Sequence, residues 1–166
     1  MNASLHVVAE YCAQREWPYE VVSEHALLFR MDLPATELVC TADATEAQFT
    51  FQTFYPFAVP PLKRRLMEDF VVRATERAEI GNLTLDPDDG VIGFRSSTAT
   101  DVSLFGLELV ASVIERHLDA APLWLPGIAG VCFLGMSPPA ALEHCVGLWP
   151  VEEVLRRACE RLSADL

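Results

Sequence analysis

The sequence predicts an α+β fold in which helices flank an antiparallel sheet, in the order helix, strands, helix, hairpin, helix, with extra helices at the C-terminus. Three observations predict it. Residues 47–55 alternate polar and aromatic side chains, which is typical of a half-buried strand. Residues 62–78 repeat apolar side chains every four residues, which is the period of a helix. Residues 83–95 form two short alternating runs around an Asp-Pro-Asp-Asp-Gly turn sequence.

The first part of the chain is expected to supply one helix and most of the sheet. Residues 3–16 carry apolar side chains near one helical face and end at Trp17-Pro18, because the residue before a proline avoids the helical conformation. Four strands are then expected. Their short connections favour antiparallel pairing, and they comprise residues 19–22, 26–33, 37–42 and 47–55.

The central helix is expected to open after Pro60 and Pro61, because proline is tolerated in a first helical turn. Gly81 and Asn82 end it, as a left-handed C-cap requires. Its apolar stripe is predicted to consist of Leu62, Leu66, Phe70 and Ala74, flanked by Met67, Val71 and Ala78.

The hairpin after this helix turns at residues 86–90. Its aspartates also suggest a calcium loop, but an EF-hand loop needs an oxygen ligand at position 5 and a glutamate at position 12. Counted from Asp86, those positions are Gly90 and Ser97. We therefore interpret the segment as a plain turn, and we expect one buried face formed by Leu83, Leu85, Ile92 and Phe94.

Residues 103–119 are predicted to form a helix whose apolar residues go nearly all the way round, which is typical of a helix buried on most sides. In a chain of this size the extra apolar side is expected to form a dimer interface, at Leu107, Val110 and Ile114. His117, near the C-terminus of this helix, is interpreted as a favourable charge at the negative end of the helix dipole.

The remaining chain is expected to be helical, within a single domain that spans residues 1–166. Residues 122–136 carry no charge, but the run is too short for a membrane helix and predicts a buried or interfacial helix. Residues 137–166 are expected to form a C-terminal helical extension, in which residues 151–162 would place apolar side chains along one face of an amphipathic helix.

Composition bounds the function. The formal net charge is −12 and the chain has one lysine, which argues against nucleic acid and against anionic membrane surfaces as partners. Acidity fits either solubility or a basic protein partner. The five cysteines form no Cys-x-x-Cys pair, and the N-terminus has no signal-peptide pattern, so we expect a cytoplasmic protein with reduced thiols.

The residues that could carry chemistry do not form a known motif. His144 and Cys145 are the pair to consider for metal or nucleophile chemistry, but zinc needs three or four ligands at workable spacing. A phosphate-binding glycine loop and a serine nucleophile elbow are both missing from the sequence. We therefore predict no catalytic, metal or cofactor-binding residue and no cofactor.

Two apolar stretches are candidates for binding a protein. Phe54 falls on the opposite side of its strand from Phe49 and Phe51, so it is the better candidate for exposure. The second candidate is the stretch Leu123, Trp124 and Leu125, because tryptophan is enriched at binding hot spots. The alternative for both stretches is burial in the core.

A group of residues around the central helix and the hairpin carries a family resemblance: Val59, Pro60, Arg65, Glu76, Asn82 and the run 85–90. These residues resemble the YbjN family of bacterial sensory transduction regulators, and the likeness covers roughly residues 15–135. It implies a fold similar to type III secretion chaperones, which are small, acidic, dimeric and bind extended segments of other proteins. Their dimer helix would correspond to residues 103–118, whereas residues 137–166 have no counterpart.

Together these observations predict a non-enzymatic protein-binding module, chaperone-like or regulatory, that acts as a homodimer. The alternative is a small ligand-binding domain or a thiol- or metal-dependent enzyme that uses His144, Cys145 or the aspartates of the turn. A fold likeness alone does not distinguish these functions.

Overall fold

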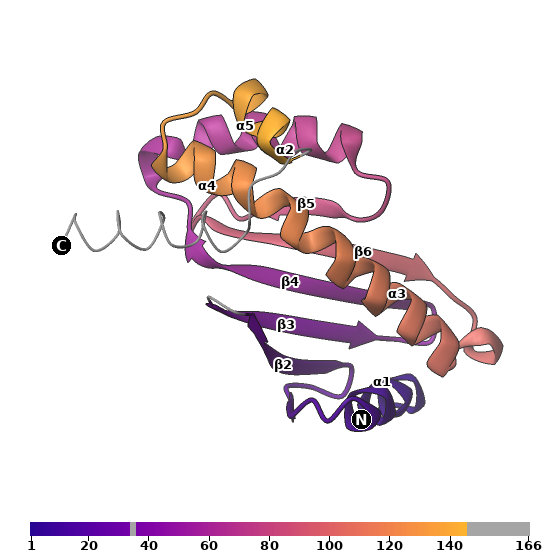
Figure 1. Cartoon of the computed structure of the whole chain (residues 1–166). Coiled ribbons are helices and arrows are strands. Elements are labelled where there is room, and N and C mark those ends of the chain that lie inside the picture. The colour runs from indigo at the N-terminus through magenta and orange to yellow at the C-terminus, as the bar shows by residue number, and fades with distance from the viewer. Residues whose placement is uncertain (34–35, 146–166) are drawn as a thin grey trace.

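The computed structural model describes residues 1–33 and 36–145. The strands form one antiparallel sheet in the order β1-β2-β3-β4-β6-β5, and the helices lie on one of its two faces (Figure 1). The fold is therefore α+β, as the alternating and helical periods predict. The strands are β1 (Tyr19–Val21), β2 (Ala26–Leu33), β3 (Thr36–Ala44), β4 (Gln48–Ala58), β5 (Asn82–Leu85) and β6 (Val91–Ala99).

The helices form in the predicted segments, but two predicted boundaries are wrong. The central helix ends at Arg77, where Ala78 is already extended, instead of at Gly81 and Asn82, and the helix predicted from residue 103 begins at Leu107. Asn2 caps the first helix, because its side-chain oxygen accepts a hydrogen bond of 2.7 Å from the backbone of Leu5. The predicted helix at residues 151–162 lies outside the described residues. The helices are α1 (Ala3–Gln14), α2 (Arg64–Arg77), α3 (Leu107–Ala120), α4 (Leu125–Phe133) and α5 (Pro138–Cys145), with short 3-10 turns η1 (Pro61–Lys63), η2 (Val102–Leu104) and η3 (Ala121–Trp124).

Strand β4 is longer than the sequence predicts, because it continues past Tyr55 to Ala58. Its register with β6 shifts between Phe54 and Ala58, and Pro56 lies in that irregular segment. Proline cannot donate a hydrogen bond to a ladder, so in a central strand it is tolerated only at such an irregularity. The strand therefore passes through Pro56 instead of ending before it.

Two hydrophobic clusters fill the space between sheet and helices. The first cluster joins α1 and the N-terminal part of α3 to β2, β3 and β4, and the second joins α2 and α4 to β5 and β6. Helix α3 crosses the sheet diagonally and ends beside α4, so it contributes to both clusters (Figure 1). The largest wholly buried side chains of the two clusters include Phe29, Phe49, Phe51, Phe70 and Phe94.

His117 of α3 lies where the two clusters meet. Its Nε2 atom is 2.8 Å from the hydroxyl of Thr53, and its Nδ1 atom is 2.9 Å from the hydroxyl of Ser96. Its ring stands 4.7 Å from the ring of Phe51 and 4.9 Å from that of Phe94, measured between centroids. We call these three polar side chains, Thr53, Ser96 and His117, the polar joint, because they connect α3 to β4 and β6.

The interpretation of His117 as a cation at the end of the helix dipole is wrong. The side chain is wholly buried, and this burial lowers its pKa from 6.5 to about 4. The imidazole is therefore neutral at pH 7. It faces the sheet because its two nitrogens find hydroxyl partners there.

The predicted stripe of α2 is only partly correct. Met67, Phe70 and Ala74 are buried, but Leu62 is 95% exposed and Leu66 is also exposed. Residues 61–63 form the 3-10 turn η1 and α2 begins at Arg64, so Leu62 does not share the orientation of the helical residues. The buried face of α2 is therefore narrower than the apolar stripe in its sequence predicts.

The turn at residues 86–90 is confirmed as a plain turn. The Asp86 carboxylate accepts hydrogen bonds from the backbone of Asp88 at 2.8 Å and of Asp89 at 3.4 Å. Gly90 has a φ of +80°, which favours glycine. Arg64 donates to the carbonyls of Pro87 and Asp88 at 2.9 and 2.8 Å, so the turn is fastened to the start of α2.

The uncharged run 122–136 folds as η3 and α4, and α4 is buried against the second cluster. The helices among residues 1–33 and 36–145 are all too short or too polar to cross a bilayer.

Candidate functional site

The residues assigned to a dimer interface lie toward the inside of α3. Val110 and Ile114 are wholly buried within a single chain, in the first cluster, and Leu107 is half-buried against the same cluster. The core of one chain is enough to account for their apolar character. Substituting Val110 or Ile114 would perturb this core before it perturbed a contact between two chains.

The candidate binding residues separate into three environments. Phe54 is half-buried on the sheet face that carries no helix among the described residues, so its predicted side is confirmed. Leu125 is only 1% exposed and belongs to the second cluster. Leu123 is 57% exposed and Trp124 is half-buried, and the structure brings these two together at one surface cavity.

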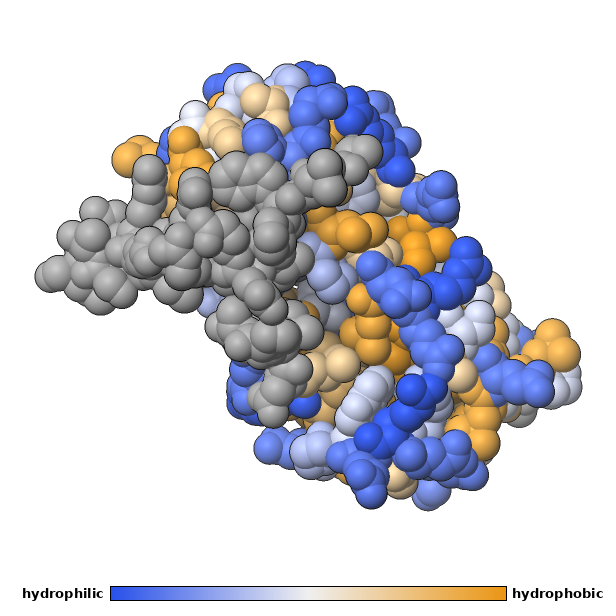
Figure 2. All heavy atoms as spheres, in the orientation of Figure 1, coloured by the Kyte–Doolittle hydropathy of each residue, from blue (hydrophilic) through white to orange (hydrophobic). Residues whose placement is uncertain are grey.

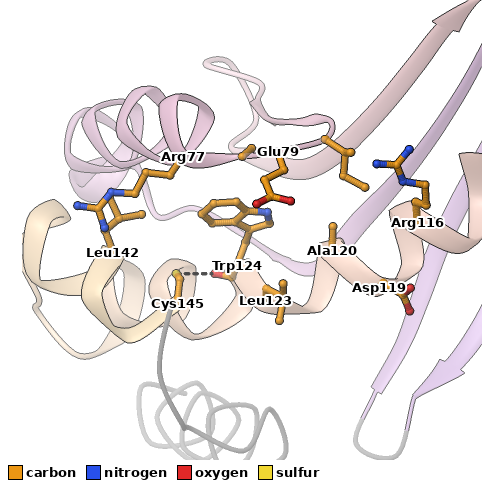
Figure 3. Close-up of a pocket in the computed structure, with 11 residues that line it drawn as sticks. Arg77, Glu79, Arg116, Asp119, Ala120, Leu123, Trp124, Leu142 and Cys145 are labelled. Carbon is orange, nitrogen blue, oxygen red and sulfur yellow. Dashed lines mark hydrogen bonds between the residues drawn. The ribbon is translucent and has the colours of Figure 1, made fainter.

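This cavity, which we call the Trp124 pocket, has a volume of about 580 Å³. Four parts of the chain line it: the end of α2 with residues 78–80, the last turn of α3, the turn η3, and α5 (Figure 3). Helix α3 runs into η3 at Ala121, where Pro122 begins a tighter turn that places Leu123 and Trp124 at the surface. The face that bears the helices shows hydrophobic side chains between hydrophilic ones along α3 (Figure 2).

The apolar part of the pocket is held in place from behind. Trp124 is half-buried: it packs against the second cluster and also lines the pocket. Leu142 of α5 and Ala120 of α3 complete the apolar wall. A half-buried tryptophan of this kind offers a large contact area at a low cost in conformational entropy.

Charges of both signs surround the apolar part. Arg77 lies at one end, Arg116 and Asp119 lie at the other, and the carboxylate of Glu79 points toward the Trp124 ring (Figure 3). Arg77 forms an exposed ion pair with Glu143 at 3.5 Å, which is too weak to hold it in place. No residue in the described ranges pairs with Arg116, so its guanidinium is available for a ligand.

The thiol of Cys145 also reaches the pocket, but it is not poised for chemistry. Burial raises its pKa to about 11, and it lies 3.6 and 3.8 Å from the carbonyl oxygens of Ala141 and Trp124. The nucleophilic form of cysteine is the thiolate, which this pKa disfavours at pH 7. No group of three His, Cys, Asp or Glu side chains in the described part of the chain comes close enough to hold a metal ion.

The polar joint resembles the serine–histidine pair of a nucleophilic enzyme in one respect. Ser96 is hydrogen-bonded to His117 and also lines a second surface cavity. The electrostatics of the joint favour a structural role. An imidazole with a pKa of about 4 is a weak general base at neutral pH, and its far nitrogen faces the Thr53 hydroxyl instead of a carboxylate. The sequence analysis missed this joint, since residues 53, 96 and 117 come from distant segments and share no spacing pattern.

Comparison of the chain with models of protein families, with curated proteins and with solved structures finds no match. The function is therefore inferred from the geometry and chemistry of the Trp124 pocket. That pocket combines an exposed leucine, a supported tryptophan and charged side chains, without a group activated for catalysis.

Proposed function

We propose that the chain is a non-enzymatic protein-binding module, chaperone-like or regulatory, that captures a segment of a partner protein in the Trp124 pocket. One observation carries the proposal: Leu123 and Trp124 lie side by side in a surface cavity whose rim is charged. Protein interfaces have this composition, with a desolvated aromatic anchor surrounded by polar residues.

A protein segment fits this pocket better than a small metabolite does. The volume of about 580 Å³ would suit either. A small-molecule site, however, directs a few polar groups toward one point, whereas Arg77 and Arg116 lie at opposite ends here (Figure 3). The separated charges favour a longer ligand that presents several side chains.

The partner segment is expected to be basic around an apolar anchor. The chain has a net charge of −12, so its field attracts positively charged partners and accelerates their association. Glu79 and Asp119 provide acidic groups at the pocket itself. A leucine or aromatic side chain of the partner would contact Leu123 and Trp124.

A peptide library displayed on phage tests the proposal, with the full chain as bait. Selected peptides should bind the Leu123→Glu variant about tenfold more weakly, equivalent to ~1.4 kcal/mol. Leu104→Glu is the matched control, because Leu104 is 72% exposed and lies outside the pocket. Peptides that bind Leu123→Glu as well as they bind the original chain would contradict the proposal.

We also propose that the chain acts as a homodimer with a type III secretion chaperone-like fold. The order helix, strands, helix, hairpin, helix supports the fold likeness, although β1 and the helices after α3 are additions. The half-buried Leu109 and Val113 support an interface, because they lie on a flank of α3 that faces a surface cavity. The likeness to the YbjN family stays a prediction.

A further inference from the structure

The Trp124 pocket lies where the described part of the chain ends. Cys145 is both the last described residue and a residue of the pocket wall. The 21 residues that follow, 146–166, therefore start from the pocket itself. A ligand tethered so closely has an effective concentration of about 1 mM or more, so even weak contacts are occupied.

The sequence of this segment suits a helix with one apolar face. Its apolar side chains recur at intervals of three and four residues, while charged side chains of both signs occupy the intervening positions. An isolated helix of about 12 residues is marginal in water, so this one needs a surface that covers its apolar face. The apolar residues are Val151, Val154, Leu155, Ala158, Cys159 and Leu162.

The distances are compatible with docking onto the same chain. Residues 146–150 span at most about 17 Å when extended, so the segment at 151–162 begins within reach of the pocket. As a helix it would be about 18 Å long. Charges of both signs flank the apolar face, with Glu152 on one side and Arg161 on the other, so this face is bordered by charges of the same two kinds as the rim, which carries Arg116 and Glu79.

We propose that residues 146–166 dock in cis across the Trp124 pocket, with the apolar face of residues 151–162 on Leu123 and Trp124. The docked segment would then compete with a partner segment for the same residues. The docking itself rests on the pocket and on the sequence of the tail, whereas the competition also rests on the proposed function.

Hydrogen exchange of the full-length chain, followed by mass spectrometry, tests the docking. Residues 151–162 should be protected in the original chain, and Leu155→Glu should reduce this protection about tenfold. Arg157→Gln is the matched control, because it changes the charge by the same amount on the polar face. A substitution in the pocket should have the same effect: Leu123→Glu should reduce the protection of residues 151–162 as much as Leu155→Glu does, whereas Leu104→Glu should leave it unchanged.

Three results would overturn the proposal. The tail of the original chain could exchange as fast as an unstructured peptide, or its protection could survive Leu123→Glu. Protection that falls on dilution would assign the docking to a second copy instead of to the same chain. Far-UV circular dichroism of Leu123→Glu verifies that the described fold is intact.

The competition is measured separately with the selected peptides. If the tail occupies the pocket, Leu155→Glu should bind these peptides several-fold more tightly than the Arg157→Gln control does. A tail that is protected while no peptide depends on Leu123 would refute the proposed function and leave the docking supported. Peptides whose binding depends on Leu123, together with an unprotected tail, would support the proposed function and refute the docking.

Discussion

Acidification should destabilise this protein through a single buried histidine. His117 has a pKa lowered from 6.5 to about 4, because burial disfavours its charged form. In the unfolded chain the imidazole regains its ordinary pKa and binds protons more readily. The neutral His117 therefore makes its full contribution to the free energy of unfolding above pH 6.5, and this contribution is lost as the pH falls toward 4.

The magnitude follows from the difference between the two pKa values. One unit corresponds to about 1.4 kcal/mol, so the free energy of unfolding should fall by about 2 kcal/mol between pH 7.5 and pH 5, and by about 3 kcal/mol near pH 4. No charged side chain among the described residues compensates for the proton, since His117 is bonded to two hydroxyl groups and flanked by two phenylalanine rings.

Urea unfolding at several pH values, in the original chain and in His117→Gln, measures this contribution. Glutamine is neutral and can both donate and accept hydrogen bonds, so the variant keeps partners for Thr53 and Ser96. We expect it to be less stable at pH 7.5 by about 1–3 kcal/mol, with a pH dependence smaller by about 2 kcal/mol at pH 5. Other titrating groups, among them Asp43 with its raised pKa, cancel in the difference.

Equal pH slopes for the two proteins would refute this reasoning. So would a nuclear magnetic resonance titration in which the His117 imidazole protonates near pH 6.5 in the folded chain. Either result would mean that water reaches the polar joint and that α3 is not sealed against the sheet there.

Two further predictions concern the turn and the oligomeric state. Gly90→Ala should destabilise the fold by about 1–3 kcal/mol, since the backbone has a φ of +80° and the new Cβ atom would lie 2.5 Å from the carbonyl oxygen of Val59. Gly106→Ala is the control, because a Cβ atom there meets nothing within 4 Å. In the same urea assay it should change the free energy of unfolding by less than about 1 kcal/mol. Light scattering at two concentrations should give twice the mass of one chain for the original protein and the mass of one chain for Leu109→Glu, and a monomeric original protein would contradict the proposed dimer.

Local periodicity was sufficient for most of the secondary structure. The strand predicted at residues 26–33 has the same bounds in the structure, and the turn at 86–90 follows from the chemistry of aspartate, proline and glycine. Alternation along β4 also placed Phe49 and Phe51 inside and Phe54 on the other side. These features depend on neighbouring residues alone, which is why a single sequence predicts them.

The failures concern contacts between distant segments. The apolar positions of α3 are shared between its inward face and its flanks, and the sequence alone cannot tell a core contact from a contact with a second chain. The exposure of Leu62 depends on where η1 gives way to α2, and element boundaries are the least reliable part of such predictions. His117 acquired its role only because the sheet brings Thr53 and Ser96 to it.

The buried joint and the proposed binding site belong to the same turns of α3. Arg116 and Asp119 face the pocket, while His117 between them faces the sheet. The two hydroxyl partners of His117 set the rotation of the helix about its axis, and that rotation decides which side chains reach the pocket rim. Trp124 is fixed independently by the second cluster. The end of the pocket at Arg116 and Asp119 and its apolar wall at Trp124 are therefore both held by the core, so a partner segment would meet a preorganised surface there and lose less conformational entropy on binding.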